Sequence, residues 1–218
     1  MLNMTARDAA LIVGANAIPL LGVLLAGWDA FTVLMLFWLE SAVIGIWVCV
    51  AVAISRQGPL EIQGMKGPPV QPGIGTALFI LAHAGIFMLV HMFFLMGFND
   101  IEGGGPDGFF NPVATIGNQL IGHGLWLPLA GLFVLRGLIT VSDHVADRRL
   151  EPIVIGFYVR IILMQLAILF GGFFVILIGG TVAPLILLII LRVAIDVGIE
   201  PIVERLGLKD GPASAEAS

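Results

Sequence analysis

The fold class is decided by residues 31–54, which read FTVLMLFWLESAVIGIWVCVAVAI. Glu40 is the only charged side chain in this stretch. A helix of roughly 20 mostly apolar residues is long enough to cross the hydrocarbon core of a bilayer. The stretch is too long for an outer-membrane β-strand and lacks the alternating pattern of one. It therefore predicts a transmembrane helix.

Further stretches of similar length and hydropathy lie on both sides of this helix. The six predicted spans are residues 9–27, 31–54, 74–97, 120–141, 152–178 and 181–203. Of all 218 residues, 59% are hydrophobic and 11% are charged, against about 25% charged in an average soluble domain. This composition excludes soluble, secreted and disordered proteins. We predict an all-α, polytopic membrane bundle of six transmembrane helices, with one domain over residues 1–210 and a disordered tail at 211–218.

The basic residues outside the predicted spans predict the orientation. Seven of them lie in the terminal segments and in the second and fourth connections: Arg7, Arg56, Lys66, Arg148, Arg149, Arg205 and Lys209. The three connections on the opposite side contain no Lys or Arg. Because basic residues are retained on the cytoplasmic side, we predict cytoplasmic N- and C-termini. The predicted location is the bacterial inner membrane, with the chain crossing it several times.

The connections and the composition limit the partners. Residues 55–73 are rich in Pro and Gly and predict a flexible cytoplasmic connection, whereas residues 98–118 form an acidic external loop. The net charge of −5 and the lack of a basic patch exclude nucleic acid as a partner. Cys49 is the only cysteine, which excludes disulfide frameworks and thiolate-cluster zinc sites. The expected partners are the lipid bilayer and, if the protein is a carrier, a second copy of the chain.

Many ionisable side chains lie inside the predicted spans, although each costs roughly 3 kcal/mol to insert into hydrocarbon. Such residues face the bundle interior and pair with one another. At about 1.5 Å per residue, Glu40, His83, Gln165 and Arg192 are predicted to share one depth. The predicted buried charge network consists of Arg136, Arg160, Arg192, Asp196 and Glu200.

Four of these ionisable residues are candidate ligands for a divalent transition metal. They are Glu40, His83, His91 and His144. Imidazole and carboxylate groups bind zinc, iron, copper and manganese. His83 and His91 are eight residues apart, about 12 Å along a helix, so one ion would need only one of them plus residues from other helices. The sequence leaves the metal, the catalytic residues and the substrate unassigned.

Several motifs resemble a prokaryotic family of six-span membrane proteins known only as a domain of unknown function. The resemblance is carried by Trp38-Leu39-Glu40, by His83-Ala84-Gly85-Ile86-Phe87 and by the pair Arg192 and Asp196. It covers nearly the whole chain and implies the six-helix fold but no activity. Members of that family have histidine where this chain has Gln165 and Glu200, so the resemblance implies that two candidate metal ligands are absent here.

Three functional hypotheses remain open. The first is a metal-dependent or acid/base enzyme with a pocket near the midplane. The second is a small proton-coupled transporter with a continuous polar route. The third is a non-catalytic assembly or interaction protein, in which every buried charge is paired and no cavity is left. We also expect Glu40 and His83 to face each other, and Arg160 or Arg192 to contact Asp196.

Overall fold

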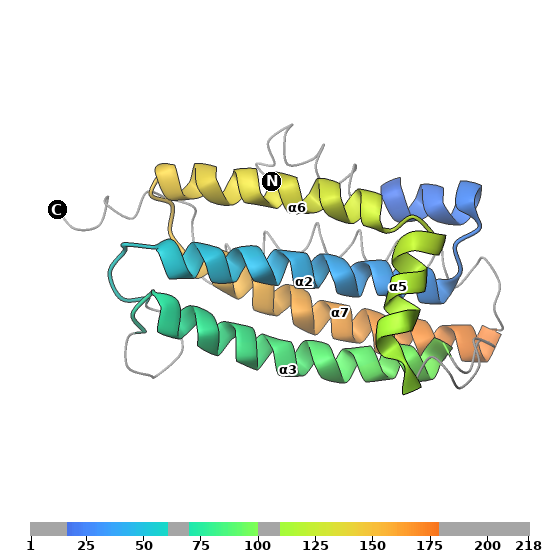
Figure 1. Cartoon of the computed structure of the whole chain (residues 1–218). Coiled ribbons are helices and arrows are strands. Elements are labelled where there is room, and N and C mark those ends of the chain that lie inside the picture. Colours follow the sequence, from blue (N-terminus) through green and yellow to red (C-terminus); the bar gives the residue numbers. More distant parts are fainter. Residues whose placement is uncertain (1–16, 61–69, 100–109, 179–218) are drawn as a thin grey trace, which may run out of the picture.

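The computed structural model describes residues 17–60, 70–99 and 110–178 (Figure 1). The labelled helices are α2 (Ala30–Ile54), α3 (Ile74–Asn99), α5 (Pro112–Gly122), α6 (Trp126–Val145) and α7 (Glu151–Ile178). A shorter helix over Ala17–Ala26 precedes them. These residues contain no β-strand, and Leu60 and Val70 form an isolated bridge. The described part of the chain is helical, as predicted.

Helix α2 is the centre of the bundle. It packs against α3, α6 and α7, and Figure 1 shows α6 and α3 along opposite sides of it. The helix begins after Asp29, whose side chain accepts a hydrogen bond from the Thr32 N–H at 2.8 Å. This cap satisfies one of the N–H groups that the first turn of a helix leaves without an intrahelical partner.

The two ends of the bundle differ in character. The ends of α2 and α6 and the beginnings of α3 and α7 lie together (Figure 1). We call this the basic end, because Arg56, Arg148 and Arg149 follow α2 and α6 there. The opposite, α5 end has the short helix α5 lying across the longer helices (Figure 1). Here the first turns of α2 are buried on all sides, from Ala30 to Phe37.

Four of the described helices are long and apolar enough to cross a membrane: α2, α3, α6 and the first 20 residues of α7. They expose large apolar side chains, for example Phe79 and Ile86 on α3 and Leu138 on α6, each more than 60% exposed. So many exposed large apolar side chains are unfavourable in water but suit contact with lipid. The chain is therefore an integral membrane protein.

The predicted fourth span was wrong in its bounds. The predicted span at 120–141 merges two helices, since α5 ends at Gly122 and α6 begins at Trp126. Gly124 between them has φ +70°, a left-handed conformation that glycine adopts at no steric cost. Part of the predicted external loop is thus the helix α5, whose cap Asn111 accepts a hydrogen bond from the Ala114 N–H.

The predicted spans at 31–54, 74–97 and 152–178 agree with α2, α3 and α7 to within two residues at each end. Of the predicted span at 9–27, the described residues form the helix Ala17–Ala26. The predicted span at 181–203 and the tail at 211–218 lie outside the described residues.

Candidate functional site

A cavity of about 260 Å³ lies between α2, α6 and α7 on the side of the basic end. Its walls combine apolar side chains with polar and charged ones. The polar and charged lining residues are Trp47, Ser55, Gln57, Arg136, Thr140, Asp143, His144, Arg148 and Arg160. The charged side chains among these described lining residues are three arginines and one aspartate; Arg148 pairs with Asp143, and Arg160 pairs with Glu40, which lies beyond the lining.

Two of the arginines lie at the same depth on different helices. Arg136 is nine residues before the end of α6 at Val145, and Arg160 is nine residues after the start of α7 at Glu151. At about 1.5 Å per residue, both lie about 13 Å from the basic end. The bundle therefore holds two guanidinium groups in one cavity within the membrane-spanning helices.

An ion pair marks the inner end of this cavity. The Arg160 Nη2 atom lies 3.5 Å from the Glu40 Oε2 atom on α2, and the two side chains are 19% and 7% exposed. Charges that leave water in this way need partners, because desolvation of each ion costs several kcal/mol. Glu40 is thus buried and paired with a cation of α7.

The expected meeting of Glu40 with His83 is not observed. The His83 side chain is exposed, and its ring lies 5.3–5.8 Å from the rings of Phe79, Phe87 and Tyr158. Glu40 lies 14 residues before the basic end of α2, whereas His83 lies nine residues after the start of α3, so the predicted common depth was wrong by about 7 Å. Depth also carries no information on rotation about each helix axis. Helix α3 turns His83 towards its aromatic neighbours and the surface.

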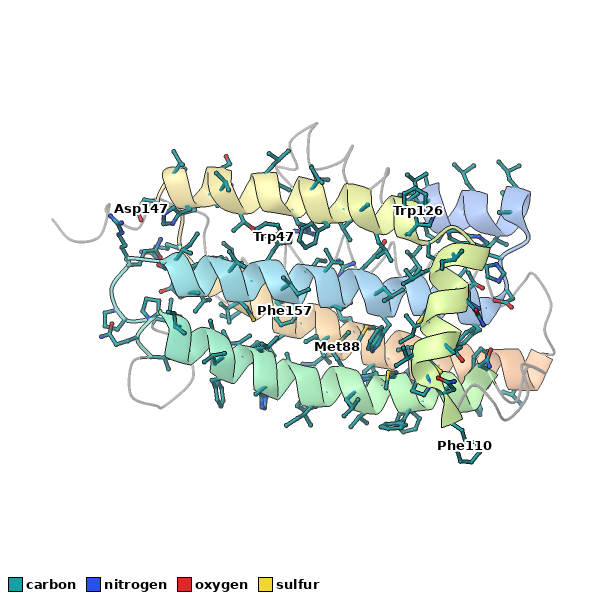
Figure 2. The ribbon with its side chains drawn as sticks, in the orientation of Figure 1. Trp47, Met88, Phe110, Trp126, Asp147 and Phe157 are labelled. Atoms are coloured by element: carbon teal, nitrogen blue, oxygen red, sulfur yellow. The ribbon has the colours of Figure 1, made fainter. Side chains whose placement is uncertain are left out.

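A tryptophan side chain packs in the wall between α2 and α6. Trp47 projects between these helices (Figure 2), and its ring centroid lies 5.0 Å from that of Phe133. A Cβ atom at Gly137 would come within 2.6 Å of the indole, so only glycine permits this approach. The Trp47 Nε1–H is buried and has no hydrogen-bond partner within the described residues.

The mouth of the cavity is held by contacts between two connections. Gln57, after α2, donates hydrogen bonds to the Asp147 carboxylate at 3.2 Å and to the Arg148 carbonyl oxygen. Leu60 is buried in a cluster with Ala51 and Leu150. The described part of the connection predicted to be flexible is therefore docked on the turn between α6 and α7.

The charges at the mouth include a second ion pair. The Arg148 Nη1 atom lies 3.4 Å from the Asp143 Oδ1 atom, and the Arg148 side chain is 52% exposed. A solvent-exposed pair of this kind contributes little to stability. It places a basic group at the entrance, beside the exposed His144.

The four candidate metal ligands are not brought together. Glu40 pairs with Arg160, His83 and His144 are exposed on different helices, and His91 is buried elsewhere on α3. The His91 Nδ1 atom lies 2.6 Å from the Phe87 carbonyl oxygen, so Nδ1 carries the proton. Within the described residues, no three His, Cys, Asp or Glu side chains are close enough to share a metal ion. The metal site predicted from Glu40, His83, His91 and His144 thus gains no support.

The predicted charge network is visible in part. Arg136 and Arg160 line the cavity, and Arg160 contacts Glu40, a pairing that the sequence did not assign. Arg192, Asp196 and Glu200 lie outside the described residues, as does the expected contact to Asp196. The sequence also gave no reason to single out Thr140 or Gln57, since neither belongs to a motif.

Comparisons with known proteins identify a family and nothing more specific. The model of a family of unknown function, DUF6498, matches residues 3–212. No curated protein and no solved structure matches the chain.

Proposed function

We propose that this chain, which belongs to the DUF6498 family of unknown function, binds an anionic ligand in the cavity between α2, α6 and α7. The family supplies no activity to carry over, so the proposal rests on the chemistry of the cavity. The observation that carries it is the placement of Arg136 and Arg160 at one depth in the same cavity.

The donor set favours an oxyanion such as a phosphate or carboxylate. A guanidinium group presents N–H donors in a planar fork that matches the oxygen atoms of both groups. The Thr140 hydroxyl adds a neutral donor to the same walls. Inside a protein such charge-assisted hydrogen bonds are stronger than in water.

We further propose that the ligand enters from the cytoplasm. The cavity lies towards the basic end, where Arg56, Arg148 and Arg149 are located. By the positive-inside rule this end faces the cytoplasm, which corresponds to the bacterial inner membrane with cytoplasmic termini in the six-span topology. Basic pockets between spans on this side are typical binding sites for anionic groups.

The cavity favours a binding function over a purely structural role for the buried charges. A non-catalytic assembly protein whose charges only join helices would leave no space between them. Here about 260 Å³ remains beside Arg136 and Arg160. An acid/base enzyme would use Asp143 and His144, which line the same cavity nearer its mouth.

A proton-coupled carrier is a second candidate, favoured by the Glu40–Arg160 ion pair. On the α5 side of this pair, the residues of α2 from Ala30 to Phe37 are buried, whereas the cavity extends from it towards the basic end. Protonation of Glu40 would remove the negative charge beside Arg160 and strengthen the attraction of Arg160 for an anion. In proteoliposomes this candidate predicts anion uptake driven by a pH gradient, which Glu40→Gln would uncouple.

The binding proposal is tested with radiolabelled inorganic phosphate and purified protein in lipid nanodiscs. We expect Arg136→Gln to weaken binding about ten- to hundredfold, since a hydrogen bond to a charged group contributes roughly 1.5–3 kcal/mol. Arg56→Gln is the matched control, because Arg56 is exposed at the same end and is not among the lining residues. Equal affinity of both variants, or no saturable binding of phosphate or acetate by the unmodified protein, would overturn the proposal.

A further inference from the structure

A polar side chain lies on the outer flank of α3, among apolar residues that face the membrane. His83 is exposed, as are Phe79, Ile86 and Phe87 around it. The 26 residues of α3 span about 39 Å, against about 30 Å for the hydrocarbon core of a bilayer. His83 lies about 13 Å from the start of α3, and the excess length of the helix is only about 9 Å. The imidazole is therefore within the hydrocarbon.

This position differs from the usual placement of ionisable residues in membrane proteins. Such residues normally face the bundle interior or a water-filled cavity, where they pair with one another. Glu40 follows this rule through its contact with Arg160, whereas His83 is exposed and does not line the charged cavity. Lipid headgroups and water are at the membrane surfaces, so a partner for the His83 ring has to come from within the membrane.

The ring contacts of His83 form an aromatic surface on this flank. Its ring centroid lies 5.6 Å from that of Phe79 at an interplanar angle of 10°, which is a stacked arrangement. The Phe87 ring lies 5.3 Å away, edge to face. Tyr158 of α7, a helix that packs against α3, adds a third ring at 5.8 Å. These distances are typical of aromatic pairs, so the three rings hold the imidazole in place.

Two groups on this aromatic surface have unused hydrogen-bonding capacity. Within the part of the chain that the structure describes, the His83 imidazole and the Tyr158 hydroxyl have ring contacts but no hydrogen-bond partner. A neutral imidazole has one N–H donor and one nitrogen acceptor, and a phenol has one O–H donor. A polar group in an apolar medium costs free energy unless it is hydrogen-bonded. The pair therefore favours a ligand that brings acceptor oxygens, which alkyl chains do not have.

We propose that His83 and Tyr158 form a binding site, open to the lipid, for a quinone with an alkyl tail. The carbonyl oxygens of a quinone ring accept hydrogen bonds, which suits the His83 N–H and the Tyr158 O–H. Its planar ring suits the faces of Phe79 and Phe87, and its tail keeps the molecule within the membrane. The site is separate from the anion-binding cavity, because neither His83 nor Tyr158 lines that cavity.

The test measures binding of tritiated decylbenzoquinone to the purified protein in lipid nanodiscs. Tyr158→Phe removes only the hydroxyl group, and His83→Leu changes an exposed side chain. Phe94→Leu is the matched control, because Phe94 is an exposed aromatic residue of the same helix, about 16 Å farther along it than His83. The quinone also dissolves in the bilayer, so only binding that unlabelled decylbenzoquinone displaces is compared, in identical nanodiscs. Decylbenzene, which lacks the carbonyl groups, is the control competitor.

We expect saturable binding that decylbenzoquinone displaces and decylbenzene does not. Tyr158→Phe should weaken binding about two- to tenfold, the range for the loss of one neutral hydrogen bond. His83→Leu should weaken it at least as much, because this change also removes the ring contacts. Phe94→Leu should bind the quinone with the affinity of the unmodified protein.

Several results would contradict the quinone site. Absence of saturable binding, or equal affinity of His83→Leu and Phe94→Leu, would overturn it. Equal competition by decylbenzene would show that apolar contact alone drives the binding, which also overturns it. If no quinone binds and native mass spectrometry shows a dimer that His83→Leu dissociates, a second copy of the chain covers this flank instead.

Discussion

At the scale of single residues, the Glu40–Arg160 pair is the feature whose removal has the largest expected cost. Glu40→Gln would leave the Arg160 guanidinium, 19% exposed, beside a neutral amide within the bundle. Breaking a buried pair in this way costs roughly 3–5 kcal/mol of unfolding free energy. We expect the lower end of this range, because Arg160 also lines the cavity. The measurement is reversible unfolding in mixed detergent micelles.

The double variant Glu40→Gln/Arg160→Gln separates pairing from other causes. If the pair accounts for the loss, the double variant should be more stable than Glu40→Gln, because it also removes the Arg160 charge that Glu40→Gln deprives of this carboxylate. Additive losses in the mutant cycle would show that Glu40 stabilises the bundle through other contacts.

The positions of these residues show how much of the candidate site could be predicted from the sequence. Hydropathy identified Glu40, Arg136 and Arg160 as charges within spans, and all three lie at or beside the cavity. Their partners could not be assigned, because α2, α3 and α7 are apolar on every side and have no amphipathic periodicity that marks the packed face. The prediction for His83 is the clearest error. The residue lies at the depth of Arg136 and Arg160, but its side chain is exposed at the surface of the bundle.

At the scale of the helices, the approach of α6 to α2 depends on Gly137. An added Cβ atom there would lie 2.6 Å from the Trp47 ring, so Gly137→Ala forces the indole or the helix to shift. Overpacking of this kind costs about 1–3 kcal/mol. Gly131→Ala on the same helix meets nothing within 4 Å and should be neutral or stabilising by up to about 1 kcal/mol, from helix propensity.

Thermal unfolding of the two glycine variants, followed by circular dichroism in detergent, checks this expectation. Gly137→Ala should also weaken phosphate binding, because Trp47 lines the cavity. Equal stability of the two variants would mean that α6 does not pack on Trp47 as described.

The helices themselves were largely predictable, with one instructive failure. The bounds of α2, α3 and α7 follow from the lengths of apolar runs, which end at Pro, Gly or charged residues. The break between α5 and α6 is not visible in hydropathy, because apolar residues continue on both sides of it. The break depends on the left-handed backbone conformation of Gly124. Glycine can adopt this conformation at no steric cost, but hydropathy does not show which glycine does so.

At the scale of the whole molecule, function depends on which end of the bundle faces the cytoplasm. Arg56 at the basic end and His123 between α5 and α6 are both exposed, and they lie at opposite ends of the bundle. Cys49 is the only native cysteine, so Cys49→Ala gives a background in which single cysteines report their location.

In bacterial cells that produce these variants, we expect a membrane-impermeant maleimide to label His123→Cys in intact cells. Arg56→Cys should be labelled only after the inner membrane is opened, because the positive-inside rule places the basic end in the cytoplasm. That result would mean that the cavity lined by Arg136 and Arg160 faces the cytoplasm, so that cytoplasmic anions can reach it. The reverse pattern would open the same cavity to the outside, so that its ligand would have to be an external anion or a lipid of the outer leaflet. Labelling of both positions in intact cells would contradict a bundle whose two ends are separated by a bilayer.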